Sequence, residues 1–321
     1  MKKTPIGLLG GSGFLGGVLA NRLVAAGYAV RIFTRARAHA RESWLLPDTD
    51  VVEVETTEQE SLNDAFAGCA TVVNLVGILN ERGDDGAGFR RAHVDVAVRA
   101  AKACKHAGVP HLVHISALNA DSFAASHYLR SKGEAEKLLA EENGRVLRVT
   151  IMRPSVMFGA QDDFTNRFAR LVRLAPGVFP LACAGARLQP VYVGDVADAC
   201  LRVIADHNLG GQRFELAGPE VVTLAELVRY VSELIGHPVR VIPLGRTLSK
   251  LQANVLEHVP GKPFSRDNLR SLEEDSVLTQ GNGLDVLGIV PTPMSVILPA
   301  YLGHAGTRHR YYAYRTTARR D

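Results

Sequence analysis

The sequence has few cysteines, a small net charge and no sign of a metal-binding motif. Its four cysteines, among 321 residues, lack metal-ligand spacing and lie in apolar or mixed contexts. They are Cys69, Cys104, Cys183 and Cys200. This pattern predicts buried thiols in a reducing compartment and no metal site. The net charge of +4 is too small to indicate a nucleic-acid partner.

Long apolar runs are also missing. No stretch reaches the ~20 apolar residues that a transmembrane segment needs. Residues 286–302 carry no charge, but three prolines interrupt them. We therefore expect the edge of a folded lobe there, with a segment lying on a membrane surface as the alternative. Two N-terminal lysines and an uncharged stretch to residue 20 resemble a secretory signal. Six glycines within residues 7–17 argue against that interpretation.

The overall composition, with 46% hydrophobic and 22% charged residues, is typical of a globular protein with a large core. Strand and helix patterns alternate from the start of the chain. This alternation predicts an α/β fold, a doubly wound parallel Rossmann sheet with helices on both faces. Its strands are expected at 6–9, 28–33, 51–54, 71–76, 111–115 and 149–152. Ser61 and Asp195 are expected to cap helices, and Thr223 with Glu226 to form a capping box.

The alternation loosens after residue 155, which suggests a second unit. We expect a dinucleotide-binding Rossmann domain over 1–155, rejoined by about 188–208. A smaller C-terminal α/β lobe is expected over 156–187 and 209–303, placed over the carboxyl ends of the strands, where such sheets bind ligands. Arginines and tyrosines dominate 304–321, which we interpret as a basic tail.

The first sixteen residues predict a dinucleotide-binding turn, with a purely structural turn as the alternative. An apolar strand leads into a glycine-rich segment, and a helical pattern follows. In such a turn, unpaired N–H groups and the positive end of the helix dipole face a pyrophosphate. Gly10 would allow the tight turn, Gly13 the approach of phosphate, and Gly16 the packing of helix on strand. The cofactor-binding residues expected here are Gly10, Ser12, Gly13, Phe14, Leu15 and Gly16.

The end of the second strand bears on the choice of cofactor. An NAD-type site places an acidic residue there, to bind the ribose 2′-hydroxyl. This chain has Arg35 and Arg37 and no acid. A guanidinium would pair with a 2′-phosphate, so we expect NADP(H) in preference to NAD(H), unless these arginines are simply solvated. Asn74, Val76 and Gly77, at the end of the fourth strand, are expected to line the next part of the groove.

A candidate catalytic set follows the fifth strand. Tyr128 and Lys132 lie four residues apart on an expected helix, so they share a face. A nearby ammonium would lower the tyrosine pKa, and such a tyrosine can exchange a proton with a carbonyl or alcohol during hydride transfer. Ser116 comes directly after the strand and could hydrogen-bond the reacting oxygen.

With these residues in this order, the chain resembles the short-chain dehydrogenase/reductases, in their extended or atypical branch. The resemblance implies that the loop Arg153-Pro154-Ser155 contacts the nicotinamide end of the cofactor. A narrower resemblance is to the NADPH-binding accessory subunit of respiratory complex I and its bacterial relatives. The stretches that carry it are His114–Ala120, Tyr128–Glu134, Arg153–Gly159 and Gln189–Val196.

These resemblances imply two main functions. One is an NADP(H)-dependent oxidoreductase, or an epimerase/dehydratase-like enzyme, acting on a small molecule that no motif identifies. The other is a non-catalytic NADPH-holding protein of a membrane-associated respiratory or quinone-related assembly. A nucleotide-dependent redox sensor is a third option. Active relatives often carry a relay asparagine where this chain has His93, which we interpret as a packing residue, with a relay role as the alternative. The expected location is the cytoplasm, with attachment to the inner face of a membrane left open.

Overall fold

The computed structural model describes residues 4–303, so the expected basic tail lies outside it. Seven parallel strands form one sheet, in the order β11-β6-β5-β4-β1-β2-β3. Their bounds are β1 Ile6–Leu9, β2 Val30–Thr34, β3 Thr49–Glu53, β4 Thr71–Asn74, β5 His111–Ile115, β6 Arg148–Pro154 and β11 Arg213–Leu216. The strand order reverses between β4 and β1, and the carboxyl ends of strands at such a switch point are where open α/β sheets bind ligands.

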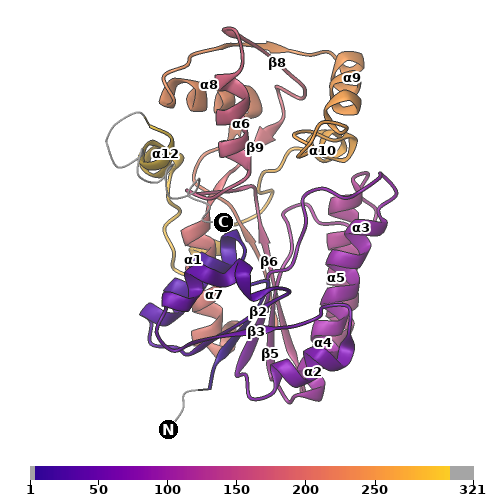
Figure 1. The fold of residues 1–321 in the computed structure, drawn as a ribbon, viewed down its shortest axis with the longest axis vertical. Helices are drawn as coiled ribbons and strands as arrows, with labels where there is room; N and C mark the ends of the chain where they lie inside the picture. Colours follow the sequence, from indigo (N-terminus) through magenta and orange to yellow (C-terminus); the bar gives the residue numbers. More distant parts are fainter. Residues whose placement is uncertain (1–3, 304–321) are drawn as a thin grey trace.

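Helices cover both faces of the sheet (Figure 1). On one face, α1 (Phe14–Ala25) packs beside α7 (Val193–Ala205) over a shared apolar core. On the other, α2 (Gln59–Phe66), α4 (Val96–His106) and α5 (His127–Glu142) cover a second core. Strands β1, β4 and β5 are buried along their whole length, because both of their faces are covered. The predicted doubly wound Rossmann fold is therefore confirmed.

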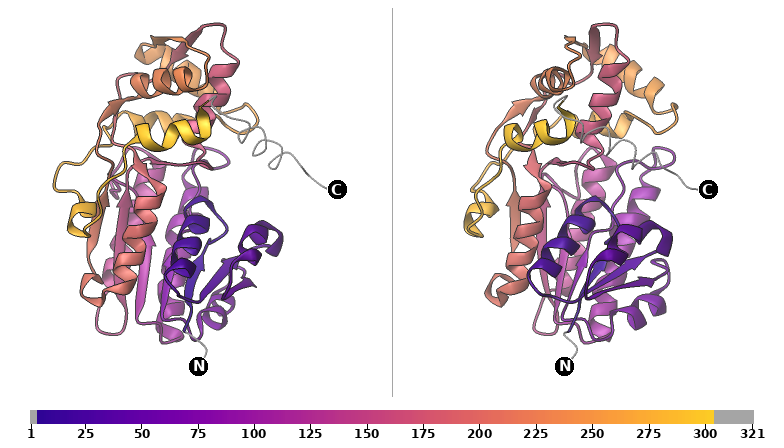
Figure 2. Two further views of the ribbon diagram at one scale, coloured as in Figure 1. Left: turned by 90° about the vertical axis from the view of Figure 1, so that its left-hand side faces the viewer. Right: turned by 60° about the vertical axis from the view of Figure 1, so that its left-hand side comes forward.

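A smaller unit, which we call the lobe, lies beyond the carboxyl ends of the strands (Figures 1 and 2). Its main elements are α6 Phe164–Arg173, β8 Val178–Leu181, α8 Leu224–Leu234, β13 Arg240–Pro243, α9 Arg246–Leu256, α10 Arg266–Leu272 and α12 Met294–Leu302. Short connecting elements are α3 Ala87–Phe89, β7 Met157–Phe158, β9 Arg187–Leu188, β10 Val191–Tyr192, β12 Val222–Thr223 and α11 Gly283–Val286. The lobe has an apolar core of its own, built mainly from α6, α8 and α12.

One strand of the sheet differs from expectation. β11 pairs with β6 at the edge of the large sheet, although the expected boundary at residue 209 placed it in the lobe. The strand is only four residues long, and Phe214 and Leu216 are its buried positions. So short an alternation is a weak signal in sequence, and its place follows from pairing with β6 over sixty residues away.

Helix starts were predicted with mixed success. The capping box of Thr223 and Glu226 at the start of α8 is present. Asp195, expected to cap α7, lies in its first turn instead, and its carboxylate accepts hydrogen bonds from Thr292 at 2.7 and 2.8 Å. Ser61 does not cap α2, because the helix begins at Gln59 and the serine hydroxyl accepts from a backbone N–H before the helix.

The uncharged C-terminal segment belongs to the lobe. Met294, Leu298 and Leu302 of α12 are buried in the lobe core, which agrees with a folded edge. Within residues 4–303, no helix has both the length and the apolar composition to cross a bilayer. Three cysteines are buried and Cys183 is half-buried, and burial raises the pKa of all four thiols.

Candidate functional site

The glycine turn lies between β1 and α1, at the reversal point of the sheet. Gly10 has a φ of +80°, a conformation that favours glycine. A Cβ on Gly16 would lie 2.5 Å from the carbonyl oxygen of Gly11, so only glycine lets α1 begin this close. The close contact is thus with the turn, rather than with the strand as expected. Gly13 is exposed at the start of α1, and no side chain caps that helix. Its first N–H groups can therefore face an anion, and the turn fits a pyrophosphate.

The end of β2 lies next to this turn. The hydroxyl oxygens of Ser12 and Thr34 are 3.5 Å apart, and Arg35 follows with an exposed side chain. Arg37 is exposed at the start of the following 3₁₀ helix. Hydrogen bonds from Thr57 lower the pKa of Glu55, and the nearby Arg35 guanidinium lowers it further. A cation and an anion therefore stand together where the adenosine ribose of a dinucleotide would lie.

The residues that follow β4 divide into two kinds. The Asn74 side chain is fully buried, where it accepts from the Val76 N–H at 3.2 Å and contacts His114 Nδ1 at 3.1 Å. It shapes the loop, instead of lining a groove as expected. Val76 packs beside Gly10, and Gly77 is exposed near Lys132. Val76 and Gly77 thus border the space between the glycine turn and α5.

Tyr128 and Lys132 lie one turn apart in α5, as the spacing predicts. The Lys132 ammonium donates to the Ile115 carbonyl at 2.9 Å, and burial lowers the lysine pKa to about 8. Burial raises the Tyr128 pKa to about 12, which is the reverse of the expected lowering. Among residues 4–303, no group hydrogen-bonds the Tyr128 hydroxyl. Tyr128 is therefore a protonated phenol, with its proton available to a ligand.

Ser116 belongs to a buried ionic network that the sequence analysis did not predict. Its hydroxyl donates to Glu136, which lies one further turn along α5 from Lys132. Glu136 also accepts from the Arg153 guanidinium, with distances of 2.6 to 3.1 Å. Arg153 donates in addition to Glu215 at 3.2 Å. The Arg153 guanidinium, expected at the nicotinamide, is thus turned to carboxylates. Glu136 comes four residues after Lys132 on an expected helix, and this spacing is the signal that could have placed a carboxylate near Ser116.

His93 lies in a π-helical turn before α4 and supports α5. Its Nε2 accepts from the Ile78 N–H at 3.1 Å. Its Nδ1 lies 2.8 Å from the Ser131 hydroxyl, which donates to the Tyr128 carbonyl. This pattern assigns the proton to Nδ1, and burial lowers the pKa of His93 to about 2. A neutral ring with both nitrogens engaged supports the packing interpretation over a relay.

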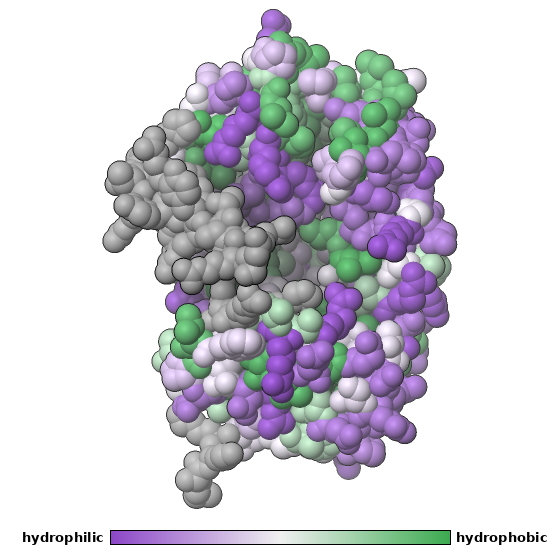
Figure 3. All heavy atoms as spheres, viewed as in Figure 1, coloured by the Kyte–Doolittle hydropathy of each residue, from purple (hydrophilic) through white to green (hydrophobic). Residues whose placement is uncertain are grey.

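A cavity of about 340 Å³ lies between the carboxyl edge of the sheet and the lobe. The sheet side contributes Phe14, Ser116, Tyr128, Pro154 and Ser155 to its wall. Residues predicted for cofactor and for catalysis thus share one space, whose volume falls within the roughly 300–1,000 Å³ of small-molecule sites. On the face drawn in Figure 3, apolar side chains gather where the lobe meets the sheet domain.

The lobe holds the start of α5 through Asp267, a residue that sequence reasoning missed. Its carboxylate accepts from the N–H groups of His127 and Tyr128, at 2.7 and 3.0 Å. It also accepts from the Ser126 hydroxyl at 3.1 Å. A carboxylate at a helix N-terminus is favourable, because it meets free N–H groups and the positive end of the dipole. Asp267 therefore ties the lobe to the turn that carries Tyr128.

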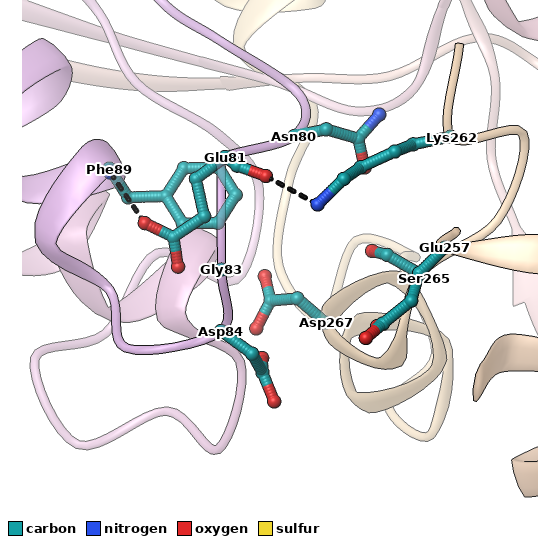
Figure 4. Close-up of a pocket in the computed structure, with 9 residues that line it drawn as sticks. All are labelled: Asn80, Glu81, Gly83, Asp84, Phe89, Glu257, Lys262, Ser265 and Asp267. Atoms are coloured by element: carbon teal, nitrogen blue, oxygen red, sulfur yellow. Dashed lines mark hydrogen bonds between the residues drawn. The ribbon is translucent and has the colours of Figure 1, made fainter. Parts of the chain in front are cut away.

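The loop before α3 is attached to the lobe beside this anchor (Figure 4). The Glu81 carboxylate accepts from one backbone N–H of its own loop and from two of α3, and Lys262 of the lobe donates to the Glu81 carbonyl at 2.8 Å. Asp84, His127 and Asp267 each bring a potential metal ligand within 4.8 Å of the others. Arg270 pairs with both carboxylates and Arg266 lies 3.6 Å from Asp84, so two cations already balance the two carboxylates in an ion-pair network.

Comparisons with known proteins agree with this geometry. Subunit 9 of the mouse mitochondrial NADH dehydrogenase [ubiquinone] 1 alpha subcomplex is 29% identical over 313 residues, which cover 95% of this chain and 80% of that protein. A ketoreductase of Stigmatella aurantiaca, named for a farnesylated dihydroquinoline oxide, is 30% identical over 71% of this chain and 72% of its own length.

A solved structure shows the same fold. UDP-glucose 4-epimerase of Thermotoga maritima superposes with a TM-score of 0.72 at 17% identity, and covers 98% of this chain and 100% of that one. At this identity the likeness concerns the fold alone. The model of the NAD dependent epimerase/dehydratase family matches residues 6–217, about two thirds of the sequence. With its glycine turn, its parallel sheet and its Tyr128–Lys132 pair, the chain belongs to the NAD dependent epimerase/dehydratase family.

Proposed function

We propose that this protein is an NADP(H)-dependent oxidoreductase that reduces a carbonyl group at Tyr128. The observation that carries the proposal is the cavity, which gives a substrate room beside Tyr128 and Ser116. The cavity continues past the residues expected at the cofactor to α6, β8 and α10 of the lobe, so it extends beyond the nicotinamide end of a cofactor. The ketoreductase relative from Stigmatella aurantiaca also favours this reaction class.

The chain's own groups suit reduction of a ketone. The cofactor supplies the hydride when it is bound. Tyr128 donates the proton to the carbonyl oxygen, because its raised pKa keeps the phenol protonated at neutral pH. Ser116 already donates its hydroxyl proton to Glu136, so its oxygen can accept a hydrogen bond from the product alcohol. Lys132 holds positive charge on the cofactor side, near Gly77.

Replacing Tyr128 tests the catalytic role. Tyr128→Phe should lower kcat for NADPH-dependent ketone reduction roughly 10²- to 10⁴-fold, the usual contribution of a positioned proton donor. Nucleotide binding should remain, because the ring and its packing are kept. Tyr230→Phe removes a hydroxyl from the lobe surface and is the matched control. Unchanged turnover in Tyr128→Phe would exclude this mechanism.

We also propose NADPH as the preferred nucleotide, on the basis of Arg35 beside the glycine turn. A charge-assisted bond to a 2′-phosphate is worth about 1.5–3 kcal/mol. Arg35→Ala should therefore weaken NADPH binding roughly 10- to 100-fold and leave NADH binding nearly unchanged. Arg240→Ala, an exposed arginine of the lobe, serves as control. Equal losses for both nucleotides would contradict the assignment.

The second candidate is a subunit that holds NADPH within a membrane-associated respiratory assembly. Its support is the similarity to the mouse NADH dehydrogenase subunit, which extends over 95% of this chain and so includes the lobe. Such a protein would co-purify with a nucleotide that neither exchanges nor changes its redox state. Steady-state NADPH consumption with a carbonyl substrate would favour the enzyme instead.

A further inference from the structure

The wall of the cavity that faces Tyr128 comes from the lobe and is mainly apolar. Phe168 and Leu171 of α6, Phe179 of β8, Leu256 of α9 and Leu272 of α10 contribute to it. Apolar groups from several elements thus converge on one space that begins at the tyrosine. Such a wall gains free energy by covering hydrocarbon and none by covering a charged group.

Most polar side chains along the cavity, apart from Tyr128, already form hydrogen bonds with other parts of the protein. The Gln252 amide accepts from the Ala182 N–H at 3.0 Å and donates to the Pro180 carbonyl at 2.9 Å. The Asn268 amide oxygen accepts from the Ser265 N–H within a capping box. These groups have their partners inside the lobe, so they are not arranged for a polyhydroxylated ligand.

The charged groups of the cavity disfavour an anionic ligand. Asp162 and Asp163 line it together with one cation, Arg167. That guanidinium is paired with Asp163 and also donates to the Pro263 carbonyl at 3.0 Å. A nucleoside diphosphate would bring negative charge to a wall with two carboxylates and no free cation among the described lining residues. Its phosphates would lose hydration without compensation.

We infer that the cavity binds the hydrocarbon part of an amphipathic ketone, with the carbonyl at Tyr128 and the chain between α6, β8 and α10. The inference deepens the proposed function, and its reaction step rests on that function. The Tyr128 hydroxyl supplies the one hydrogen-bond donor that such a ligand needs. The apolar wall then selects for chain length, because each buried methylene adds a similar increment of affinity.

Calorimetric titration of the NADP⁺-loaded protein with methyl ketones tests the inference independently of turnover, because the oxidised nucleotide has no hydride to transfer. Over chains of roughly four to ten carbons, affinity should rise about fourfold per methylene until the cavity is filled. UDP-glucose, the matched polar probe, should show no binding. Affinity that is independent of chain length, or UDP-glucose binding tighter than the longest ketone, would overturn the inference.

Two leucines of one helical segment give matched variants. Leu171→Asp puts a charge in the wall and should weaken long-chain binding at least about tenfold, whereas Leu174→Asp, at a position 83% exposed, should not. Leu171→Trp should fill the space and shorten the longest chain that still gains affinity. If both Leu171 variants bind every ketone as the wild type does, the inference fails.

Binding and turnover separate the two proposals. Chain-dependent binding without NADPH oxidation would leave this inference standing and remove the reductase function. Reduction of short ketones, with an affinity that does not change with chain length, would support the reductase function and overturn this inference.

Discussion

Lys132 is buried in an environment that disfavours the protonated, charged form of its side chain. It is 4% exposed, donates to one carbonyl, and has a pKa of about 8 instead of 10.5. The buried Glu136 carboxylate partly offsets the cost, since it raises the lysine pKa. A lysine in this state changes charge within the range where enzymes operate, which is a property of functional sites as well as of ion-pair networks.

The pKa of Lys132 predicts how stability depends on pH. Between pH 8 and 10.5 the unfolded chain binds a proton that the folded chain does not, so stability should increase with pH across this window. The total increase should be about 3 kcal/mol, from the ~1.4 kcal/mol that each pKa unit represents. Lys132→Met should remove this increase, measured by urea unfolding of the cofactor-free protein at several pH values.

Lys137→Met is the matched control, because Lys137 is exposed on the same helix. It should leave the alkaline rise unchanged. A wild-type protein whose stability is flat or falls between pH 8 and 10, relative to Lys132→Met, would show that the ammonium is not destabilised by burial.

Among the helices, α5 carries Tyr128 and Lys132, and two neighbouring elements hold it in place. The π-helical turn supports it through His93 and Ser131, and α10 holds its first turn through Asp267. The second contact joins residues about 140 positions apart in sequence. The lobe therefore positions Tyr128 as well as enclosing the cavity beside it.

Removing the Asp267 carboxylate should loosen this connection. Asp267→Ala breaks two hydrogen bonds to α5 and one to its N-cap residue Ser126, and it leaves Arg270 with one partner fewer. We therefore expect a loss of about 3 kcal/mol in unfolding free energy. Asp267→Asn keeps one acceptor oxygen and should lose less. Asp64→Ala, exposed on α2, is the control for a lost carboxylate. If Asp267→Ala unfolds at the same urea concentration as the wild type, the contact of Asp267 with α5 does not contribute to stability.

At the scale of the whole molecule, three histidines are buried as neutral rings. Burial lowers the pKa of His93 to about 2, of His114 to about 3 and of His111 to about 4. His93 supports α5, while the other two lie on β5 in the middle of the sheet. His111 contacts the Thr150 hydroxyl at 2.8 Å, so each ring has at least one partner.

These rings predict loss of stability in mild acid. Below pH 6.5 the unfolded chain binds up to three protons that the folded protein does not, so stability should fall as the pH decreases. The slope should approach about 4 kcal/mol per pH unit above pH 4.5, before most carboxylates titrate. Chemical unfolding monitored by circular dichroism from pH 7 to 4.5 measures it.

Replacing one of the three histidines measures its own contribution to the pH dependence of stability. His114→Gln should reduce the acid slope by about 1.4 kcal/mol per pH unit, while His258→Gln, at an exposed position, should not change it. Equal slopes for wild type and His114→Gln would mean that His114 is protonated in the folded protein.

The sequence was most informative where the signal is local. The run from Ile6 to Gly16 contains a strand, a turn and a helix start within eleven residues, so residue type alone predicts the backbone. The Tyr128–Lys132 pair needs only helical spacing, and the capping box at Thr223 only three residues. The α/β alternation likewise follows from short-range patterns, and the sheet that it predicts is present.

Long-range partners and burial were outside the reach of those patterns. Residue types and their spacing were enough to predict a Rossmann fold with a glycine turn and a helix that carries Tyr128 and Lys132. The contacts of Asp267 with that helix, of Arg153 with Glu136 and of β11 with the sheet became visible only in the folded chain. The raised pKa of Tyr128 and the apolar wall of the cavity also depend on the tertiary structure, because desolvation is set by the residues that the whole chain packs around a group.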